Sequence, residues 1–429
     1  MDTKAILAII ISLLIVGSAY VVLTNDAEVK DETEESEDET PDAIGDITSF
    51  DEAVNAFSFD FFRKLYEERG STDNIFYSPY SVFTALAMTY EGAKENTAVE
   101  MENVLNIEQD NDSFHEYMQS LYQYLNENSE YNISTANALW PDYDFTLLPE
   151  YEQIIEDYYG GHSEPVEYGY PDEAARTINE WVENQTNNLI KDLVPASAID
   201  PIFTKLILTN AIYFKGIWEV QFDELNTTDR DFTDVQGNTL EISTMKLLGK
   251  GDKYNYTETE KFQMLELPYK GDDISMMIIL PKEGVDLSDV ANSLNWENYA
   301  TRVGEMYQTK ADIYLPKFKF ETSYTLNDYL IDLGMIDAFS DSANFSGIDG
   351  LPDLFISRVL HKAFIEVNEE GTEAAAATAV IMTYSAYDPT ARPERITFDC
   401  NHPFLFTIHH KETGTILFMG EVADLSSQE

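Results

Sequence analysis

The sequence has a single cysteine, Cys400, among its 429 residues. One cysteine excludes a disulfide within the chain, so the fold must rely on its apolar core. With 44% hydrophobic and 13% aromatic residues, the chain has ample material for such a core. Cys400 lies in the strand-like run Phe398–Phe406, and we expect its thiol to be buried and unreactive.

Basic residues are scarce, with 26 lysines and arginines against 79 acids and a formal net charge of −53. Residues 1–52 hold fourteen of the acids and two of the lysines, so 65 acids still face 24 bases in the remainder. Such a surface excludes nucleic acid and anionic membranes as partners. It suits a halophilic protein, because salt screens the repulsion between like charges; the alternative is a generally acidic secreted protein.

Catalytic motifs are also missing. The chain has no G-x-S-x-G elbow, no H-E-x-x-H, no G-x-x-x-x-G-K phosphate loop and no cysteine/histidine cluster with zinc spacing. Ser243–Lys246 matches S-x-x-K without the other β-lactamase motifs, and His409 and His410 alternate between the two faces of a strand. The sequence therefore predicts that the protein is not an enzyme and has no cofactor and no metal site.

The first 49 residues differ from the rest of the chain. Residues 5–24 are uncharged and long enough to cross a bilayer as a helix, while the Gly-Ser-Ala run at 17–19 offers a cleavage position. Residues 1–25 are thus either a removed signal peptide or a retained membrane anchor. Residues 26–49 are acidic and poor in apolar side chains, so we expect a disordered tether. Both interpretations place the remainder outside the cell, secreted or on the outer face of the membrane.

The stretch Val367–Tyr387 reads V-N-E-E-G-T-E-A-A-A-A-T-A-V-I-M-T-Y-S-A-Y and follows a strand-like run at Phe355–Val367. Propensity favours a short helix from Glu373, but an isolated helix of this length is marginal in water. At period two, one face carries only small side chains before Val380, namely Thr372, Ala374, Ala376 and Thr378. No proline precedes Pro389, so every amide here could donate to a β-ladder. Such a segment can be an exposed loop and later a central strand, with Gly371 as its hinge.

These residues resemble the serpin family. E-E-G-T-E-A-A-A-A-T-A at Glu369–Ala379, followed by F-D-C-N-H-P-F-L-F at Phe398–Phe406, looks like the serpin reactive-centre hinge and the strand after it. Further serpin-like segments occur in the family's order: N-I-F-Y-S-P-Y-S at Asn74–Ser81, N-A-I-Y-F-K-G-I-W at Asn210–Trp218, L-P-Y-K-G at Leu267–Gly271, Y-L-P-K-F at Tyr314–Phe318 and I-L-F-M-G at Ile416–Gly420.

The resemblance implies an α+β serpin fold, with several helices, three β-sheets and an exposed reactive-centre loop at about residues 369–396. The serpin domain would span residues 50–429. Sequence periodicity agrees with mixed α+β structure, since helical patterns come early: Ala53–Glu67, Ser81–Glu91 and Arg176–Leu193. Strand patterns dominate later: Leu206–Phe214, Phe262–Leu267, Ile274–Leu280, Ala311–Phe320 and Thr415–Val422.

The resemblance also implies inhibition of serine endopeptidases by a monomeric suicide substrate, in which the cleaved hinge enters the sheet as a new central strand and the protease stays covalently trapped. The implied hinge residues are Glu369, Glu370, Gly371, Thr372, Glu373, Ala374, Ala375, Ala376, Ala377 and Thr378. The family's spacing of fourteen residues from Gly371 places the cleaved bond between Ser385 and Ala386. These small residues suit an elastase-like or subtilisin-like protease, whereas cleavage after Tyr384 would suit a chymotrypsin-like one.

The resemblance further implies a group of residues that controls opening of the sheet. A histidine like His361 bonds an asparagine like Asn210 near serines like Ser78 and Ser81, and a tryptophan like Trp218 lies where insertion begins. Two alternatives to inhibition stay open. A noninhibitory serpin acting as a binding or chaperone protein would carry a bulky or charged side chain on the inward face of the hinge. An acidic cell-envelope structural protein would leave the hinge unexplained.

Overall fold

The computed structural model describes residues 48–70, 73–107, 111–126, 131–249, 253–372 and 395–427. The predicted signal or anchor segment 1–25, the hinge residues Glu373–Thr378 and the predicted cleavage residues Tyr384, Ser385 and Ala386 lie outside these ranges. So does the tether 26–49 except for Thr48 and Ser49, which form the start of the first helix. Within the described ranges, none of the helices combines the length and apolar character needed to span a membrane.

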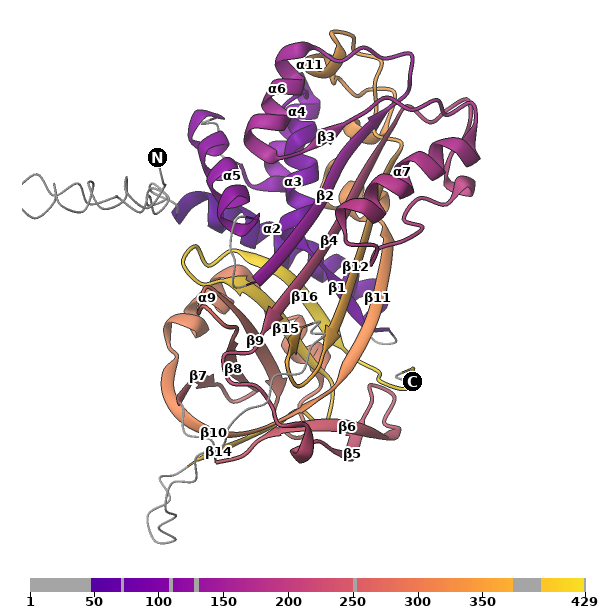
Figure 1. Ribbon diagram of the computed structural model, residues 1–429. Helices are drawn as coiled ribbons and strands as arrows, with labels where there is room; N and C mark the ends of the chain where they lie inside the picture. Colours follow the sequence, from indigo (N-terminus) through magenta and orange to yellow (C-terminus); the bar gives the residue numbers. More distant parts are fainter. Residues whose placement is uncertain are drawn as a thin grey trace, which may run out of the picture. The chain divides into compact units, whose positions relative to one another are not determined.

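A six-stranded sheet runs through the molecule (Figure 1). Its strands, in spatial order, are β11 (Phe318–Thr325), β12 (Arg358–Val367), β13 (Gly371–Thr372), β4 (Leu206–Ile217), β2 (Tyr131–Pro141) and β3 (His162–Ser163). The first nine residues of β4 are all buried, as expected for a strand with both faces covered. One face packs into the main core through Leu208 and Ile212, and the other packs into a second apolar cluster through Ile207 and Ala211.

The remaining strands form a ten-stranded sheet. Its path is β1 (Ile75–Tyr77), β16 (Ile416–Val422), β15 (Phe404–His410), β9 (Ile274–Pro281), β8 (Phe262–Pro268), β7 (Lys253–Glu258), β10 (Tyr307–Pro316), β6 (Thr239–Leu247) and β5 (Thr228–Thr233), with β14 (Ile396–Asp399) parallel to β10. The first part of β10 pairs with β7 and the second part with β6 and β14. The assembly is thus two sheets that share β10, and with the six-stranded sheet it makes the three β-sheets that were expected.

Helices α3 (Pro79–Tyr90) and α7 (Pro171–Gln185) lie on opposite faces of the six-stranded sheet, and the described residues form further helices around the two sheets (Figure 1). These are α2 (Thr48–Arg69), α4 (Glu95–Leu105), α5 (Asn111–Asn126), α6 (Pro149–Tyr159), α8 (Leu287–Ala291), α9 (Trp296–Gly304), α10 (Asn327–Leu333) and α11 (Ser346–Asp349), with short 3-10 turns at Ala196–Ala198, Glu224–Asn226 and Asp337–Phe339. Helix α3 is buried at every residue and contacts β2, β4 and β16, so it lies between the two sheets. Helix α7 packs on the opposite face of β2.

The predicted helix Arg176–Leu193 is wrong at both ends, because α7 begins at Pro171 and ends at Gln185. Proline is favoured in the first helical turn, where its missing N–H leaves no hydrogen bond unmade. Asn187 and Asn188 then have φ values of 52° and 62°, which break the helical backbone. Asparagine tolerates this left-handed region better than most residues do.

Candidate functional site

Strands β4 and β12 are parallel neighbours over only part of their length. Arg358 to Ala363 on β12 pair with Ile207 to Ile212 on β4. Beyond this closed end the two strands separate, and the short strand β13 lies between them, antiparallel to both. The hinge predicted from sequence therefore begins inside a gap between two parallel strands.

A buried polar cluster crosses the closed end. Asn137, Asn210 and His361 are register partners on β2, β4 and β12. The Asn210 side-chain amide donates to Asn137 Oδ1 at 2.7 Å and to Ser81 Oγ at 2.6 Å. His361 Nδ1 bonds Asn210 Oδ1, and Ser81 Oγ donates to Asn137 Oδ1 at 2.9 Å. These side chains tie three strands to one another and to helix α3.

Ser78 connects the polar cluster to the start of α3. Its hydroxyl accepts from Ser81 N at 3.1 Å, which caps the helix, and donates to Leu417 O at 2.6 Å. Its backbone N–H donates to His361 Nε2 at 3.1 Å. Since Nε2 accepts, the ring proton belongs on Nδ1, facing Asn210. Burial lowers the pKa of His361 to about 3, so the ring stays neutral and serves as a structural bridge.

The structure brings the four residues predicted for the closed end together, because hydrogen bonds link Ser78, Ser81, Asn210 and His361, and each is 0% exposed. Sequence reasoning missed Asn137, which completes the cluster. Its signal in the sequence is weak: a single polar amide in the run Ala136–Trp140, whose other residues are apolar. A buried amide needs partners, and here the neighbouring strand and helix supply them.

The open end is built around Gly371 and Thr372. Gly371 pairs with Ile217, while Thr372 pairs with Gly216 on one side and Val367 on the other. A Cβ on Gly371 would lie 1.9 Å from the Gly216 carbonyl oxygen, so only glycine fits. The Thr372 hydroxyl lies 2.6 Å from the Tyr269 hydroxyl and is buried.

Trp218 fixes the turn that leads into β13. Its indole stacks on Tyr269, with ring centroids 4.4 Å apart and planes within 12° of each other. The indole N–H donates to Asn368 O at 3.0 Å, and the backbone N–H donates to Glu370 O at 2.8 Å. Trp218, which the resemblance places where insertion would begin, thus lies beside the turn that leads to Gly371. Tyr269 was missed, although it lies in the serpin-like segment Leu267–Gly271.

Glu369 anchors the base of the hinge. Its carboxylate accepts from Lys317 Nζ at 2.7 Å and from Thr227 Oγ1 at 2.8 Å, and its carbonyl accepts from Phe222 N at 3.0 Å. Burial on its own would raise the pKa of Glu369, but the hydrogen bonds from Lys317 and Thr227 hold the pKa below its usual value. Neither Lys317 nor Thr227 was predicted, because an ion pair across strands leaves no local sequence pattern.

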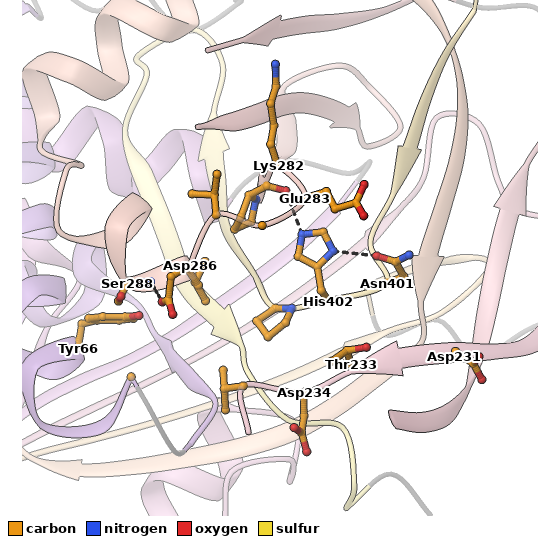
Figure 2. A pocket seen from close by; sticks show the side chains of 17 residues that line it. Tyr66, Asp231, Thr233, Asp234, Lys282, Glu283, Asp286, Ser288, Asn401 and His402 are labelled. Carbon is orange, nitrogen blue, oxygen red and sulfur yellow. Dashed lines mark hydrogen bonds between the residues drawn. The ribbon is translucent and has the colours of Figure 1, made fainter. Parts of the chain in front are cut away.

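The pocket in Figure 2 lies apart from this gap and has a volume of about 690 Å³. Several of its polar groups have structural roles: Asp234 accepts from the backbone of Gln236 and Asn238, and Asp286 caps α8. His402 contacts Asn401 and the Pro281 carbonyl oxygen (Figure 2). These contacts make loop-shaping turns, so the gap between β4 and β12 is the stronger candidate site.

The other sequence expectations concern single residues. Cys400 is buried as expected, and burial raises the pKa of its thiol well above the ordinary value, which makes it unreactive. His409 and His410 are both buried in β15, where burial lowers the pKa of each to about 4. Among the described residues, no group of three or more histidine, cysteine or acidic side chains is arranged to hold a metal ion.

The fold and this gap define a class of α+β protein in which a loop begins as a short strand between two parallel strands of a central sheet. The chain belongs to the serpin family, described as serpin (serine protease inhibitor), which it matches over residues 52–425. It is 42% identical over 373 residues to a serpin-like protein of Thermococcus kodakarensis, covering 86% of this chain and 84% of the relative.

Solved structures agree with this membership. Serpin48 of the insect Tenebrio molitor aligns with a TM-score of 0.80 and 31% identity, over 90% of this chain and all of that one. Human thyroxine-binding globulin aligns with a TM-score of 0.79 and 25% identity, over 88% of this chain and 99% of that one. The family is one of protease inhibitors whose members are not themselves catalysts, and its targets are serine proteases.

Proposed function

We propose that this protein inhibits serine endopeptidases as a suicide substrate. The observation that carries the proposal is the position of Gly371 and Thr372, which already pair with both β4 and β12 at the open end of the gap. A chain that starts there can lengthen β13 only toward the closed end, because further residues add to an existing ladder.

The chemistry uses the protease's own catalytic serine. Its hydroxyl oxygen attacks the carbonyl carbon of Ser385, the C–N bond to Ala386 breaks, and the proton passes to the leaving amine. An ester between Ser385 and the protease remains. Insertion of the freed hinge then carries the bound protease away from its attack position before water can cleave the ester.

The register of β13 defines where each inserted residue would go. Counting on from Thr372 opposite Gly216 and Val367, Thr378 would lie between Asn210 and His361, with its side chain on their face of the sheet. Its hydroxyl could replace the hydrogen bond that those two side chains lose. Met382 would lie opposite Leu206, the first residue of β4. The inserted segment carries small alanines on both faces, so it could enter between the two apolar clusters that cover the sheet.

The free energy released by insertion would be sufficient to distort the active site of the protease. About ten inserted residues, each adding backbone hydrogen bonds worth ~0.5 to 1.5 kcal/mol net, give a driving force on the order of 10 kcal/mol. Distorting an oxyanion hole requires less, since each of its donors contributes only ~3 to 4 kcal/mol to catalysis. The intact protein would therefore be metastable, with its strain released on cleavage.

The partner follows from the cleaved bond. Small residues at Ser385 and Ala386 suit an elastase-like or subtilisin-like protease, and cleavage after Tyr384 a chymotrypsin-like one. The uncharged segment 5–24 supports a protein that acts outside the cell, secreted or tethered to the outer face of the membrane. The acidic composition supports work at high salt.

A second candidate is a noninhibitory binding protein. The similarity to thyroxine-binding globulin and the pocket of about 690 Å³ favour it. Against it stands the inward face of the hinge, where Thr372 is followed by Ala374 and Ala376, without the bulk or charge that would stop insertion.

One experiment separates the two functions. The purified protein is incubated with subtilisin and with pancreatic elastase, and the products are resolved on a denaturing gel. We expect a denaturant-stable adduct and a released peptide that begins at Ala386. Complete cleavage of the loop by both proteases without any adduct would refute inhibition and favour the binding protein.

A further inference from the structure

The register that guides insertion also predicts where the trapped protease ends. Strand β4 begins at Leu206, so the last three residues before the cleaved bond would run beyond the strand, beside the turn at residues 200–205. On the same count, Ser385 would lie opposite Phe203. The ester that holds the protease would therefore form its final contacts at this turn.

This turn presents two large apolar side chains to solvent. Ile202 is 71% exposed and Phe203 is 68% exposed. The turn is firmly built, because the Asp200 carboxylate accepts from the backbone N–H of both residues at 2.9 and 3.0 Å. Thr204 closes it, donating from its backbone to Asp200 O and accepting at its hydroxyl from Asp200 N. The apolar pair is thus held outward by its own backbone.

A third exposed apolar side chain belongs to the same end of the sheet. Pro141 pairs with Leu206, and Asp142 N donates to Lys205 O at 2.9 Å, so the chain that leaves β2 stays beside the turn. The next residue, Tyr143, is 71% exposed. We call Tyr143, Ile202 and Phe203 the apolar end patch. On a chain with 79 acids, three large apolar side chains exposed at one end of a sheet mark an interaction surface.

We propose that the apolar end patch is the docking surface for the trapped protease, and that it slows release of the enzyme. This inference rests on the proposed inhibitory function. Release requires water to attack the ester, leaving Ser385 as a carboxylate and restoring the protease's serine hydroxyl. Contact of the protease with Ile202 and Phe203 would exclude water from that end and hold the displaced enzyme in place.

The test compares two variants of the full chain. In the first, Ile202→Ser and Phe203→Ser are combined, which keeps both backbone donors to Asp200. The matched control is Leu225→Ser, which removes an 88% exposed apolar side chain from the 3-10 turn Glu224–Asn226, near the hinge. Thr227, which follows that turn, bonds Glu369, so the control lies at the other end of β4.

Three quantities are measured with subtilisin and elastase: the rate of adduct formation, the adduct yield, and the rate at which active protease is released from the isolated adduct. We expect formation and yield to stay unchanged in the double variant, while release becomes about tenfold faster, as loss of one buried apolar contact would give. The control variant should release protease at the wild-type rate.

Other outcomes overturn the inference in distinguishable ways. A stable adduct that the double variant releases at the wild-type rate would refute docking and leave inhibition intact. Absence of an adduct with the wild-type chain would refute inhibition and this inference with it. Sedimentation of both proteins before protease is added tests whether a second copy of the chain occupies the patch. If the wild type were a dimer and the double variant a monomer, the patch would be assigned to self-association instead.

Discussion

The two ends of the β4–β12 pair are held in opposite ways. At the closed end the backbone of β12 pairs with that of β4, and side chains add to this pairing: His361 bonds Asn210 across the strands, and helix α3 braces both. At the open end the strands are apart, and the hinge is held by the short pairing of β13, the Tyr269 contact, hydrogen bonds from Trp218 and the partly exposed ion pair of Glu369 with Lys317. The closed end is fully buried, whereas the Lys317 side chain is 39% exposed.

The difference indicates the direction of opening. A strand entering at Gly371 meets backbone that is already separated, and it reaches the polar cluster only after several residues have paired. By then the new hydrogen bonds can offset the loss of the backbone pairing between β4 and β12 and of the bond between His361 and Asn210. In the proposed insertion, the polar cluster would act as a late barrier and the hinge as an early, low-stability element.

Cleavage of the loop should erase the contrast between the two ends and give the largest effect. After proteolysis near Ser385, insertion would fill the gap with a driving force on the order of 10 kcal/mol. For a domain of this size, we expect the midpoint of thermal unfolding to rise by roughly 10 °C. Calorimetry of intact and nicked protein measures the shift. A nicked form that melts no higher than the intact one would remove the basis of the mechanism.

Blocking strand insertion at the open end should give the second largest effect, a loss of inhibition. Thr372→Arg places a guanidinium beside Tyr269 in a buried position, where an unpaired charge costs several kcal/mol. Insertion should stall at its first step, so the variant becomes a substrate that is cleaved without forming an adduct. Thr372→Ser keeps the hydroxyl and is the control. Tight inhibition by Thr372→Arg, measured as moles of inhibitor consumed per mole of protease, would contradict this order of events.

Most of the fold was predictable because its signals are local and ordered along the chain. Segments such as Asn74–Ser81 and Asn210–Trp218 carry their own strand or turn pattern and became parts of β1, α3 and β4. The sequence did not reveal the end of α7, because asparagine is also common outside turns. Asn187 and Asn188 therefore gave no clear signal. Whether asparagine takes a positive φ depends on its surroundings, here on Thr186, which bonds back to Val182.

The candidate site was predictable in its named residues and less so in their partners. The resemblance supplied His361, Asn210 and the serines, while Asn137 joined them only through strand pairing. No sequence pattern marks Lys317 as the partner of Glu369, since 52 residues separate them. The register of β13, which gives the positions of inserted residues, exists only in three dimensions.

Acid should weaken the closed end specifically. His361 has a pKa of 6.5 when unfolded and about 3 when folded, because burial disfavours the charged ring. A depressed pKa means that the unfolded state binds more protons below pH 6.5, so this contribution is complete above pH 6.5 and is lost as the pH falls toward 3. The expected loss between pH 7 and pH 4 is about 3 kcal/mol.

A variant separates His361 from other buried groups. His409 and His410 act in the same sense, while Asp51 and Glu421, whose pKa values burial raises to about 6 and about 9, act in the opposite one. Urea unfolding at pH 7 and pH 4 is therefore compared between the wild type and His361→Gln. We expect a smaller loss in the variant, and equal losses would show that the ring's proton does not govern the closed end.

The smallest effect is expected where the open end relies on its ion pair. Glu369→Gln keeps the shape of the side chain but weakens its bonds to Lys317 and Thr227, each 2.7 to 2.8 Å long. A hydrogen bond to a charged group contributes ~1.5 to 3 kcal/mol, and the exposure of Lys317 places this pair at the lower end of that range. The free energy of unfolding should fall by about 1 to 2 kcal/mol at pH 7.

The control is Glu366→Gln, which breaks the more exposed pair with Lys319 on the same sheet. It should change the free energy of unfolding by less than about 0.5 kcal/mol. If Glu369→Gln lost no more stability than Glu366→Gln, the ion pair would not hold the open end, and the hinge would have to be held by Tyr269, Trp218 and the backbone bonds.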